Sequence, residues 1–253
     1  MKKYINWKIF FILLSSSLLS IALVFPYIIS LQSETLKKIG QPVGLIFLAQ
    51  LIQSLILFSA AIFFGLYFTK KINFQIPILE AIANKKSFKK ILNDILKKSV
   101  LFGTAAAIII YLFDFIFTYL GAMISTHQNY APIWQKLLAA LYGGISEEIL
   151  MRLFLTTLFI WLGLKIFKQD EPSKTNILIS IVLAAIIFGL GHLPITASLT
   201  GLNLLIISRA IILNGIGGII FGWLFWKKGL ESAIIAHFTA DIFLLTILPL
   251  VFG

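Results

Sequence analysis

The stretch Glu147-Glu148-Ile149-Leu150-Met151-Arg152 places three ionisable side chains inside an apolar run that extends from Trp134 to Phe167. A run of that length and composition predicts a helix that crosses a membrane. A charge at the centre of a bilayer costs about 3 kcal/mol on insertion scales, so such residues are kept where they pair or have a function. The stretch therefore predicts a membrane protein with a polar site inside it.

The composition of the whole chain agrees with a membrane protein. Of its 253 residues, 59% are hydrophobic, whereas soluble domains contain about 45–50% apolar residues. Seven predominantly apolar runs are each long enough to span a bilayer, namely 9–30, 43–69, 99–126, 134–166, 177–193, 202–226 and 230–252. We predict an all-α, polytopic transmembrane bundle that forms a single domain over 1–253. A break in the sixth run near Asn214-Gly215 would raise the number of spans to eight.

The longest connection between the predicted spans, residues 70–98, contains eight lysines. Its second half repeats apolar residues at helical spacing between the lysines, which predicts an amphipathic cytoplasmic helix around 86–98. The apolar stripe of this helix either lies on an anionic leaflet or packs against the bundle. With the N-terminus in the cytoplasm, sixteen lysines lie on the cytoplasmic side and three on the other. This bias predicts a cell-membrane protein with its N-terminus inside and its C-terminus outside.

The formal net charge of +11 does not indicate a nucleic-acid partner, because the lysines cluster at the ends of apolar runs and set the membrane topology. Membrane lipid is the expected partner of these charges. The chain has no cysteine, which excludes disulfides, thiolate catalysis and cysteine-ligated metal. Lys2, Lys3 and Lys8 precede the first run, and that run is long enough to span. We therefore expect a retained helix and not a cleaved signal peptide.

Glu147, Glu148 and Arg152 differ in the partners that a regular helix would give them. Glu148 and Arg152 are four residues apart, so they share a helix face and can form an ion pair. One interpretation is that this ion pair only holds helices together. The other is that it also orients the residues of a site. Glu147 lies about 100° around the helix from Glu148 and has no evident partner. It is a candidate general base for water, or else a protonated group bonded to a helix carbonyl.

Two histidines lie in other apolar runs. His192 ends the fifth run and His237 lies about one-third into the seventh. Neutral imidazoles can bind a metal, hold a water beside Glu147 or donate to an oxyanion. Asp241 follows His237 by four residues and could accept its second N–H, which would fix the imidazole tautomer. Phe188 precedes His192 by four residues and is expected to pack on that ring, to wall a cavity, or to face lipid.

Other polar residues in the predicted spans have simpler interpretations. Asp114 and Arg209 are expected to pair with each other, or else to line the same cavity. Ser146 precedes Glu147 in a sequence that only faintly resembles a serine nucleophile turn, so it is not expected to be catalytic. The HExxH zinc motif, the P-loop and the dinucleotide fingerprint are all missing from the sequence.

Taken in order, the motifs EExxxR (Glu147, Glu148, Arg152), FxxxH (Phe188, His192) and HxxxD (His237, Asp241) resemble those of the CPBP family of intramembrane proteases. This family, also called Abi or CAAX-protease-like, includes the type II CAAX prenyl endopeptidases and bacterial proteins linked to bacteriocin processing or immunity. The resemblance covers roughly 100–250, which would form the catalytic core, with 70–98 as a lysine-rich connector.

The resemblance implies a role for each motif residue. Glu147 would activate the hydrolytic water with His192, and His237 with Asp241 would stabilise the oxyanion. Glu148, Arg152 and Phe188 would shape the site. The family often has asparagine at the last position, and an ionised Asp241 would repel an oxyanion. Asp241 is therefore expected either to be protonated or to serve His237.

The resemblance predicts an intramembrane endopeptidase that cuts a membrane-associated peptide or protein by glutamate-activated water. The family is classed as metal-dependent, so Glu147, His192 and His237 are candidate ligands for Zn²⁺, although a mechanism without a tightly held metal is also open. The alternatives are a non-catalytic bacteriocin-immunity protein and a proton-coupled small transporter. All catalytic readings require a short, tilted or broken fifth span, because His192 is predicted nearer the outer surface than Glu147 and His237.

Overall fold

The computed structural model describes residues 5–122 and 131–252, and every regular element in these ranges is a helix. The α-helical and π-helical (η) elements are α1 (Trp7–Leu31), α2 (Ser33–Ile39), α3 (Val43–Lys71), α4 (Pro77–Ala83), α5 (Lys89–Tyr119), α6 (Ile133–Tyr142), η3 (Gly143–Glu147), η4 (Ile149–Thr156), α7 (Thr157–Ile166), α8 (Lys174–Gly191), α9 (Leu193–Thr200), α10 (Leu204–Lys228), α11 (Leu230–Ile242), η5 (Phe243–Ile247) and α12 (Leu248–Phe252).

Seven helical units within the described ranges are long and apolar enough to cross a membrane. This confirms the predicted all-α bundle with seven spans. The sixth run is one uninterrupted helix, α10, so the break considered near Asn214-Gly215 does not occur. The chain is a multi-pass membrane protein.

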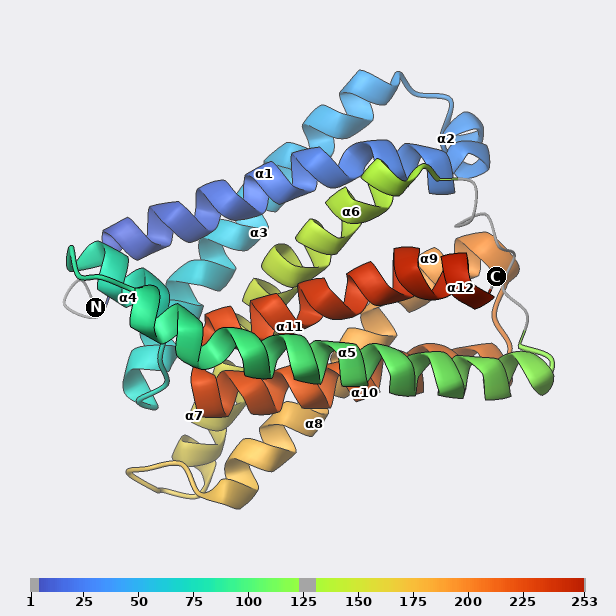
Figure 1. Ribbon diagram of the computed structural model, residues 1–253. Helices are drawn as coiled ribbons and strands as arrows, with labels where there is room; N and C mark the ends of the chain where they lie inside the picture. The colour runs from blue at the N-terminus through green and yellow to red at the C-terminus, as the bar shows by residue number, and fades with distance from the viewer. Residues whose placement is uncertain (1–4, 123–130, 253) are drawn as a thin grey trace.

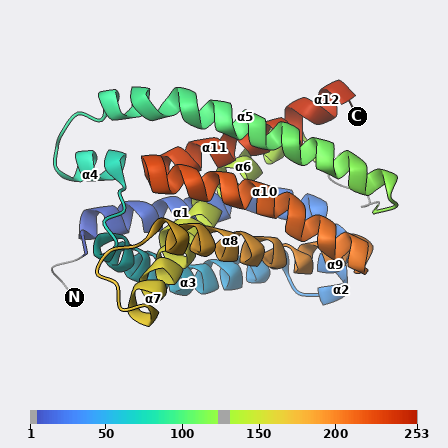
Figure 2. The same cartoon turned by 90° about the horizontal axis from the view of Figure 1, so that it is seen from below.

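The two ends of the bundle differ in what they hold. Figures 1 and 2 both show α4 and the start of α1 at one end, and α2, α9 and the C-terminal helix α12 at the other. Because the chain crosses the membrane an odd number of times, its first and last helices begin and end on opposite sides. The α4 end also receives the C-terminus of α3 with Lys70 and Lys71 and the first turn of α5. We refer to it as the lysine-rich end. Lys2 and Lys3, which contributed to the predicted orientation, lie outside the described residues.

The distribution of apolar side chains is that of a bundle surrounded by lipid. Helix α3 exposes Leu48, Ile52 and Ile56 on one face, while Ile62 and Leu66 are buried in the main core. Contiguous exposed apolar surface of this kind would be unfavourable in water but is at no disadvantage against acyl chains. The polar interior therefore has to be explained by pairing and not by contact with solvent.

The amphipathic segment near 86–98 is helical, but it is not a separate surface helix. Residues 89–98 form the first turns of the long helix α5, which the sequence analysis had started at 99. No glycine or proline interrupts residues 89–102, so the helix continues into the membrane. Ile95 is buried, and the hydroxyl oxygen of Ser99 lies 2.8 Å from the hydroxyl oxygen of Ser232 in α11. Ile95 thus packs on the bundle, whereas Phe88 and Leu96 of the same apolar stripe are 37% and 41% exposed. The predicted end of this span, at 123–126, lies outside the described residues.

Only the middle of the predicted 70–98 connector lies between spans, and the short helix α4 is anchored there. The backbone N–H of Leu79 donates to Oε1 of Glu231, at 2.8 Å, in the first turn of α11. Glu231 is buried. The sequence analysis did not identify this residue, which ties the connector to the start of the last span.

The fifth span is broken at His192. Helix α8 ends at Gly191, and α9 begins at Leu193 with Pro194 in its first turn. Proline has no backbone N–H to donate and its ring disturbs the preceding turn, so a continuous helix is not maintained there. The catalytic interpretation required such a break, and it occurs at the histidine of the FxxxH motif.

The predicted orientation can be tested directly because the chain has no cysteine. We expect a membrane-impermeant maleimide to label Lys37→Cys in intact cells, but to label Lys97→Cys only after permeabilisation. Both positions are exposed, in α2 and in the first turns of α5. The unmodified chain is the control for background labelling. The opposite labelling pattern would show that the N-terminus is outside.

Candidate active site

The site forms where α6 and η3 pack on α11, and a pair of glycines permits the close crossing. A Cβ atom on Gly144 would lie 3.0 Å from the carbonyl oxygen of Ile234. A Cβ atom on Gly143 would overlap Oδ2 of Asp241 and lie 3.2 Å from Nε2 of His237. Small residues let membrane helices approach to backbone contact. The Gly143-Gly144 pair directly before the acidic motif is a signal that the sequence analysis did not use.

The acidic motif lies in an irregular part of its span. Helix α6 gives way to π-helical turns in η3, which ends at Glu147, and in η4, which contains Arg152. The widened turn is visible at Thr156, whose hydroxyl donates to the carbonyl of Met151, five residues earlier, at 2.8 Å. Such π-helical insertions are frequent at functional sites. The regular helix assumed from the sequence did not anticipate this geometry.

His237 is the centre of the site and contacts three carboxylates. Its Nδ1–H donates to Oε1 of Glu148 at 2.8 Å. Its Nε2 lies 3.7 Å from Oε2 of Glu147 and 3.6 Å from Oδ2 of Asp241. The sequence favours Asp241 as an acceptor for an imidazole N–H; the structure gives the hydrogen bond at Nδ1 to Glu148, and Asp241 faces the other ring nitrogen at 3.6 Å. Glu147, expected to be without a partner, also approaches Nε2.

Glu148 connects His237 to Arg152. Its Oε2 lies 3.2 Å from Nε of Arg152, and the two side chains are 0% and 1% exposed. The predicted ion pair between Glu148 and Arg152 is therefore confirmed. The two atoms are close, but they are not aligned as a hydrogen bond. Removing one partner of such a buried pair costs about 3–5 kcal/mol, because the other charge is left uncompensated. Glu148 thus holds a guanidinium with one oxygen and an imidazole with the other.

Two aromatic rings enclose these groups. Phe221 of α10 stacks on His237 with ring centroids 4.7 Å apart and an interplanar angle of 23°. The guanidinium of Arg152 lies over the rings of Phe188 and Phe221, at 5.4 and 5.7 Å from their centroids. Phe188 thereby walls the site, as one of its predicted alternatives stated. Phe221 was not identified from the sequence, since a phenylalanine in an apolar run carries no distinguishing signal.

His192 lies beside the site, with the Phe188 ring next to both imidazoles. Phe188 packs edge-on against His192 and against His237, with centroid separations of 4.7 and 5.8 Å. Nδ1 of His192 donates to the carbonyl oxygen of Phe188 at 2.8 Å. A carbonyl only accepts, so a neutral His192 carries its lone pair on Nε2. The structure thus brings Glu147 and Asp241 to the same nitrogen of His237, while His192 reaches this group through Phe188.

A cavity of about 80 Å³ opens beside His237 and Asp241. Its walls come from α5, α8, α10 and the last span, and they are mostly apolar. Asn214 is a polar exception, and its Nδ2 donates to the carbonyl of Ala210 at 2.8 Å. A cavity of this size has room for a few water molecules. In the sequence, Asn214 marks only a possible break in the sixth span, and nothing there indicates that it lines a cavity.

Three other polar residues singled out in the sequence, Asp114, Arg209 and Ser146, have structural partners. Nε and Nη2 of Arg209 lie 2.6 and 2.5 Å from Oδ1 of Asp114, which confirms the predicted pair. The hydroxyl oxygen of Ser146 lies 2.7 Å from that of Ser20 in α1, in a fully buried contact. Ser146 therefore joins two helices and does not face His237.

The residues proposed as zinc ligands do not gather as a metal site. Among the residues that the structure describes, no group of three or more histidine, aspartate or glutamate side chains is arranged to hold a metal ion. Glu147 and His237 are neighbours, but Phe188 lies against both imidazoles and His192 has no contact with Glu147 among the described residues. The set does not fit a zinc ion as these residues stand.

The role of Gly144 can be tested by stability. We expect Gly144→Ala to lower the thermal unfolding temperature in detergent by several degrees, because its Cβ atom would press on the α11 backbone at Ile234 and Phe238, and overpacking costs roughly 1–3 kcal/mol. Gly215→Ala is the matched control, since a Cβ atom there meets nothing within 4 Å. Equal unfolding temperatures for the two variants would contradict the close crossing at Gly144.

Comparison with known proteins adds the family. Residues 129–243, which include all three motifs, match the family model of type II CAAX prenyl endopeptidase Rce1-like proteins. Searches of curated proteins and of solved structures give no match. Residues 129–243 of the chain are thus similar to the Rce1-like family of CAAX proteases, the family that its motifs predicted.

Proposed function

We propose that this protein is an intramembrane endopeptidase that hydrolyses a peptide bond of a membrane-associated peptide or protein by glutamate-activated water. The observation that carries the proposal is the position of His237. Glu148 binds one of its nitrogens, while the other faces Glu147 and Asp241 beside a cavity. The match of residues 129–243 to a CAAX protease family supports peptide-bond hydrolysis as the reaction.

Glu147 is the proposed general base. Its side chain is 20% exposed, whereas that of Glu148 is fully buried and already binds Arg152 and His237. In the proposed step, Glu147 takes a proton from water, and the hydroxide attacks the carbonyl carbon of the substrate. The same carboxyl then gives the proton to the leaving nitrogen as the C–N bond breaks.

His237 is the proposed stabiliser of the oxyanion. Three carboxyl groups contact it, and one of them, Glu148, also contacts the guanidinium of Arg152, so an imidazolium would reduce the excess negative charge. Because Nδ1–H is held by Glu148, the proton on Nε2 would point toward the reacting carbonyl. A donor fixed before the charge develops is the most effective form of such stabilisation.

Asp241 and His192 complete the proposed site from the two sides. Asp241 is 21% exposed and lies 3.6 Å from Nε2 of His237, so in its protonated form it could donate to the same oxyanion. His192 has no hydrogen-bond partner for Nε2 among the described residues, and it would hold the attacking water with Glu147 through a water-mediated contact. No step of this mechanism uses a metal ion.

The partners and the location follow from the same proposal. The substrate is a peptide that reaches the site from the membrane, and no nucleic acid takes part. The protein lies in the cell membrane with its N-terminus in the cytoplasm.

The central test is the variant Glu147→Gln. Loss of a general base reduces the rate by about 10²–10⁴-fold, whereas the protein should still accumulate in the membrane because Glu148, not Glu147, holds Arg152. The substrate is found by comparing the membrane peptides of cells that make the active protein and the variant. Glu171→Gln, in an exposed connection, is the matched control. Normal turnover by Glu147→Gln would rule out Glu147 as the base.

Asp241 gives a second, independent test. If Asp241 acts as a neutral donor, Asp241→Asn should keep cleavage within about tenfold, since an amide N–H donates without repelling the oxyanion. Asp241→Ala, which removes the donor, should lose more than the asparagine variant. Cleavage rates of the peptide identified above provide the measurement. Equally large losses in the asparagine and alanine variants would mean that the carboxylate charge itself is required.

A further inference from the structure

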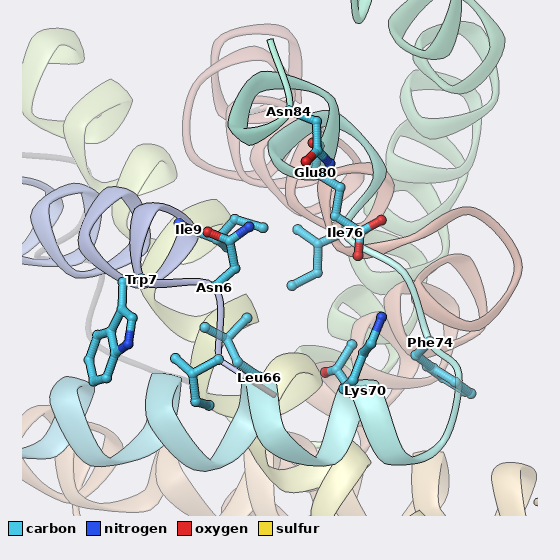
Figure 3. A pocket seen from close by; sticks show the side chains of 11 residues that line it. Asn6, Trp7, Ile9, Leu66, Lys70, Phe74, Ile76, Glu80 and Asn84 are labelled. Atoms are coloured by element: carbon cyan, nitrogen blue, oxygen red, sulfur yellow. Dashed lines mark hydrogen bonds between the residues drawn. The ribbon is translucent and has the colours of Figure 1, made fainter. Parts of the chain in front are cut away.

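A second, larger cavity lies at the lysine-rich end of the bundle and shares no residue with the candidate active site. Its volume is about 610 Å³, within the range of roughly 300–1,000 Å³ that is usual for ligand pockets. Figure 3 shows that it is enclosed by the start of α1, the C-terminal end of α3 and the segment that leads into α4.

Two opposite charges face each other across this cavity. In Figure 3 the ammonium group of Lys70 and the carboxylate of Glu80 point toward one another from α3 and α4. Neither side chain forms an ion pair with a described residue. Burial raises the pKa of Glu80, and the positive charge of Lys70 opposes this rise. A ligand that fits between them would therefore carry both a negative and a positive group.

A buried hydroxyl lies next to the lysine. Thr69 lines the cavity and is only 4% exposed, and its Oγ1 has no hydrogen-bond partner among the described residues. Buried polar atoms without a partner are rare in native proteins. Thr69 and Lys70 together provide a hydroxyl and an ammonium donor on the same part of the wall, as an anionic oxygen group would require.

The other walls are apolar, and the cavity lies at the level of lipid headgroups. Ile9, Leu66 and Ile76 are buried along it. Trp7 lies at the edge of the cavity, at the start of the first span, and its side chain is 46% exposed. Tryptophan and lysine at the ends of spans mark the boundary between acyl chains and water. The cavity is thus placed where the polar end of a phospholipid and its first apolar atoms would lie.

We propose that this cavity binds the headgroup of a zwitterionic phospholipid with a primary amine, its phosphate on Lys70 and Thr69 and its ammonium group on Glu80. A purely anionic headgroup suits the site less well because Glu80 would repel it. A quaternary amine suits it less well because it has no N–H to donate to the carboxylate. The apolar walls favour a lipid over the soluble phosphate compound alone.

Native mass spectrometry of the full chain, released from detergent with defined lipids, tests the proposal. We expect the protein to retain phosphatidylethanolamine in preference to phosphatidylglycerol and phosphatidylcholine. Lys70→Gln and the nearly isosteric Thr69→Val should each lower this retention by about tenfold, as expected for loss of a hydrogen bond to a charged group. Glu80→Gln should remove the preference over phosphatidylglycerol.

The controls separate this site from general attraction to the lysine-rich end. Lys97→Gln removes an exposed lysine of the same end that does not line the cavity, and it should retain the lipid like the unmodified chain. Equal retention of the three lipids, or retention unchanged by both Lys70→Gln and Thr69→Val, would overturn the proposal. Free phosphoethanolamine provides a further arm: tight binding without any lipid would assign the site to a soluble compound and overturn the lipid assignment.

Discussion

The structure depends on one fully buried contact, in which the carboxylate of Glu148 lies between Arg152 and His237. None of these groups can be left alone at this depth, because the surrounding lipid and apolar side chains offer no water to replace a lost partner. The pair on one span therefore fixes where α11 must lie. The Gly143-Gly144 pair then allows the two helices to approach closely enough for the contact to form.

This arrangement divides the charged residues into two groups. Glu148 and Arg152 are buried, paired and enclosed by Phe188 and Phe221. Glu147 and Asp241 lie on the other side of His237 and keep about one-fifth of their side chains exposed. The buried group holds the imidazole in place. The proposed mechanism assigns water and substrate to the exposed group, and the imidazole of His237 contacts both groups.

The fold could be predicted from the sequence because lipid leaves the backbone few choices. A spanning segment must satisfy its N–H and C=O groups internally, so all seven apolar runs form helices, although α5 begins at Lys89 and not at 99. The motifs also identified which charged residues meet. The sequence did not predict that Glu148, and not Asp241, binds Nδ1 of His237, or that Phe221 stacks on that ring. Those contacts depend on π-helical turns and on interhelical distances, which a regular 3.6-residue period does not contain.

The break at His192 explains why the FxxxH spacing matters. Pro194 ends the regular helix, so the imidazole lies at a helix terminus and would be free to turn. Its Nδ1 is bound to the carbonyl of Phe188, four residues earlier, while the Phe188 ring packs against both imidazoles. One phenylalanine thus orients His192 through its backbone and encloses His237 through its side chain. A change in the spacing of these two residues would separate the two functions, although each residue type would still be present.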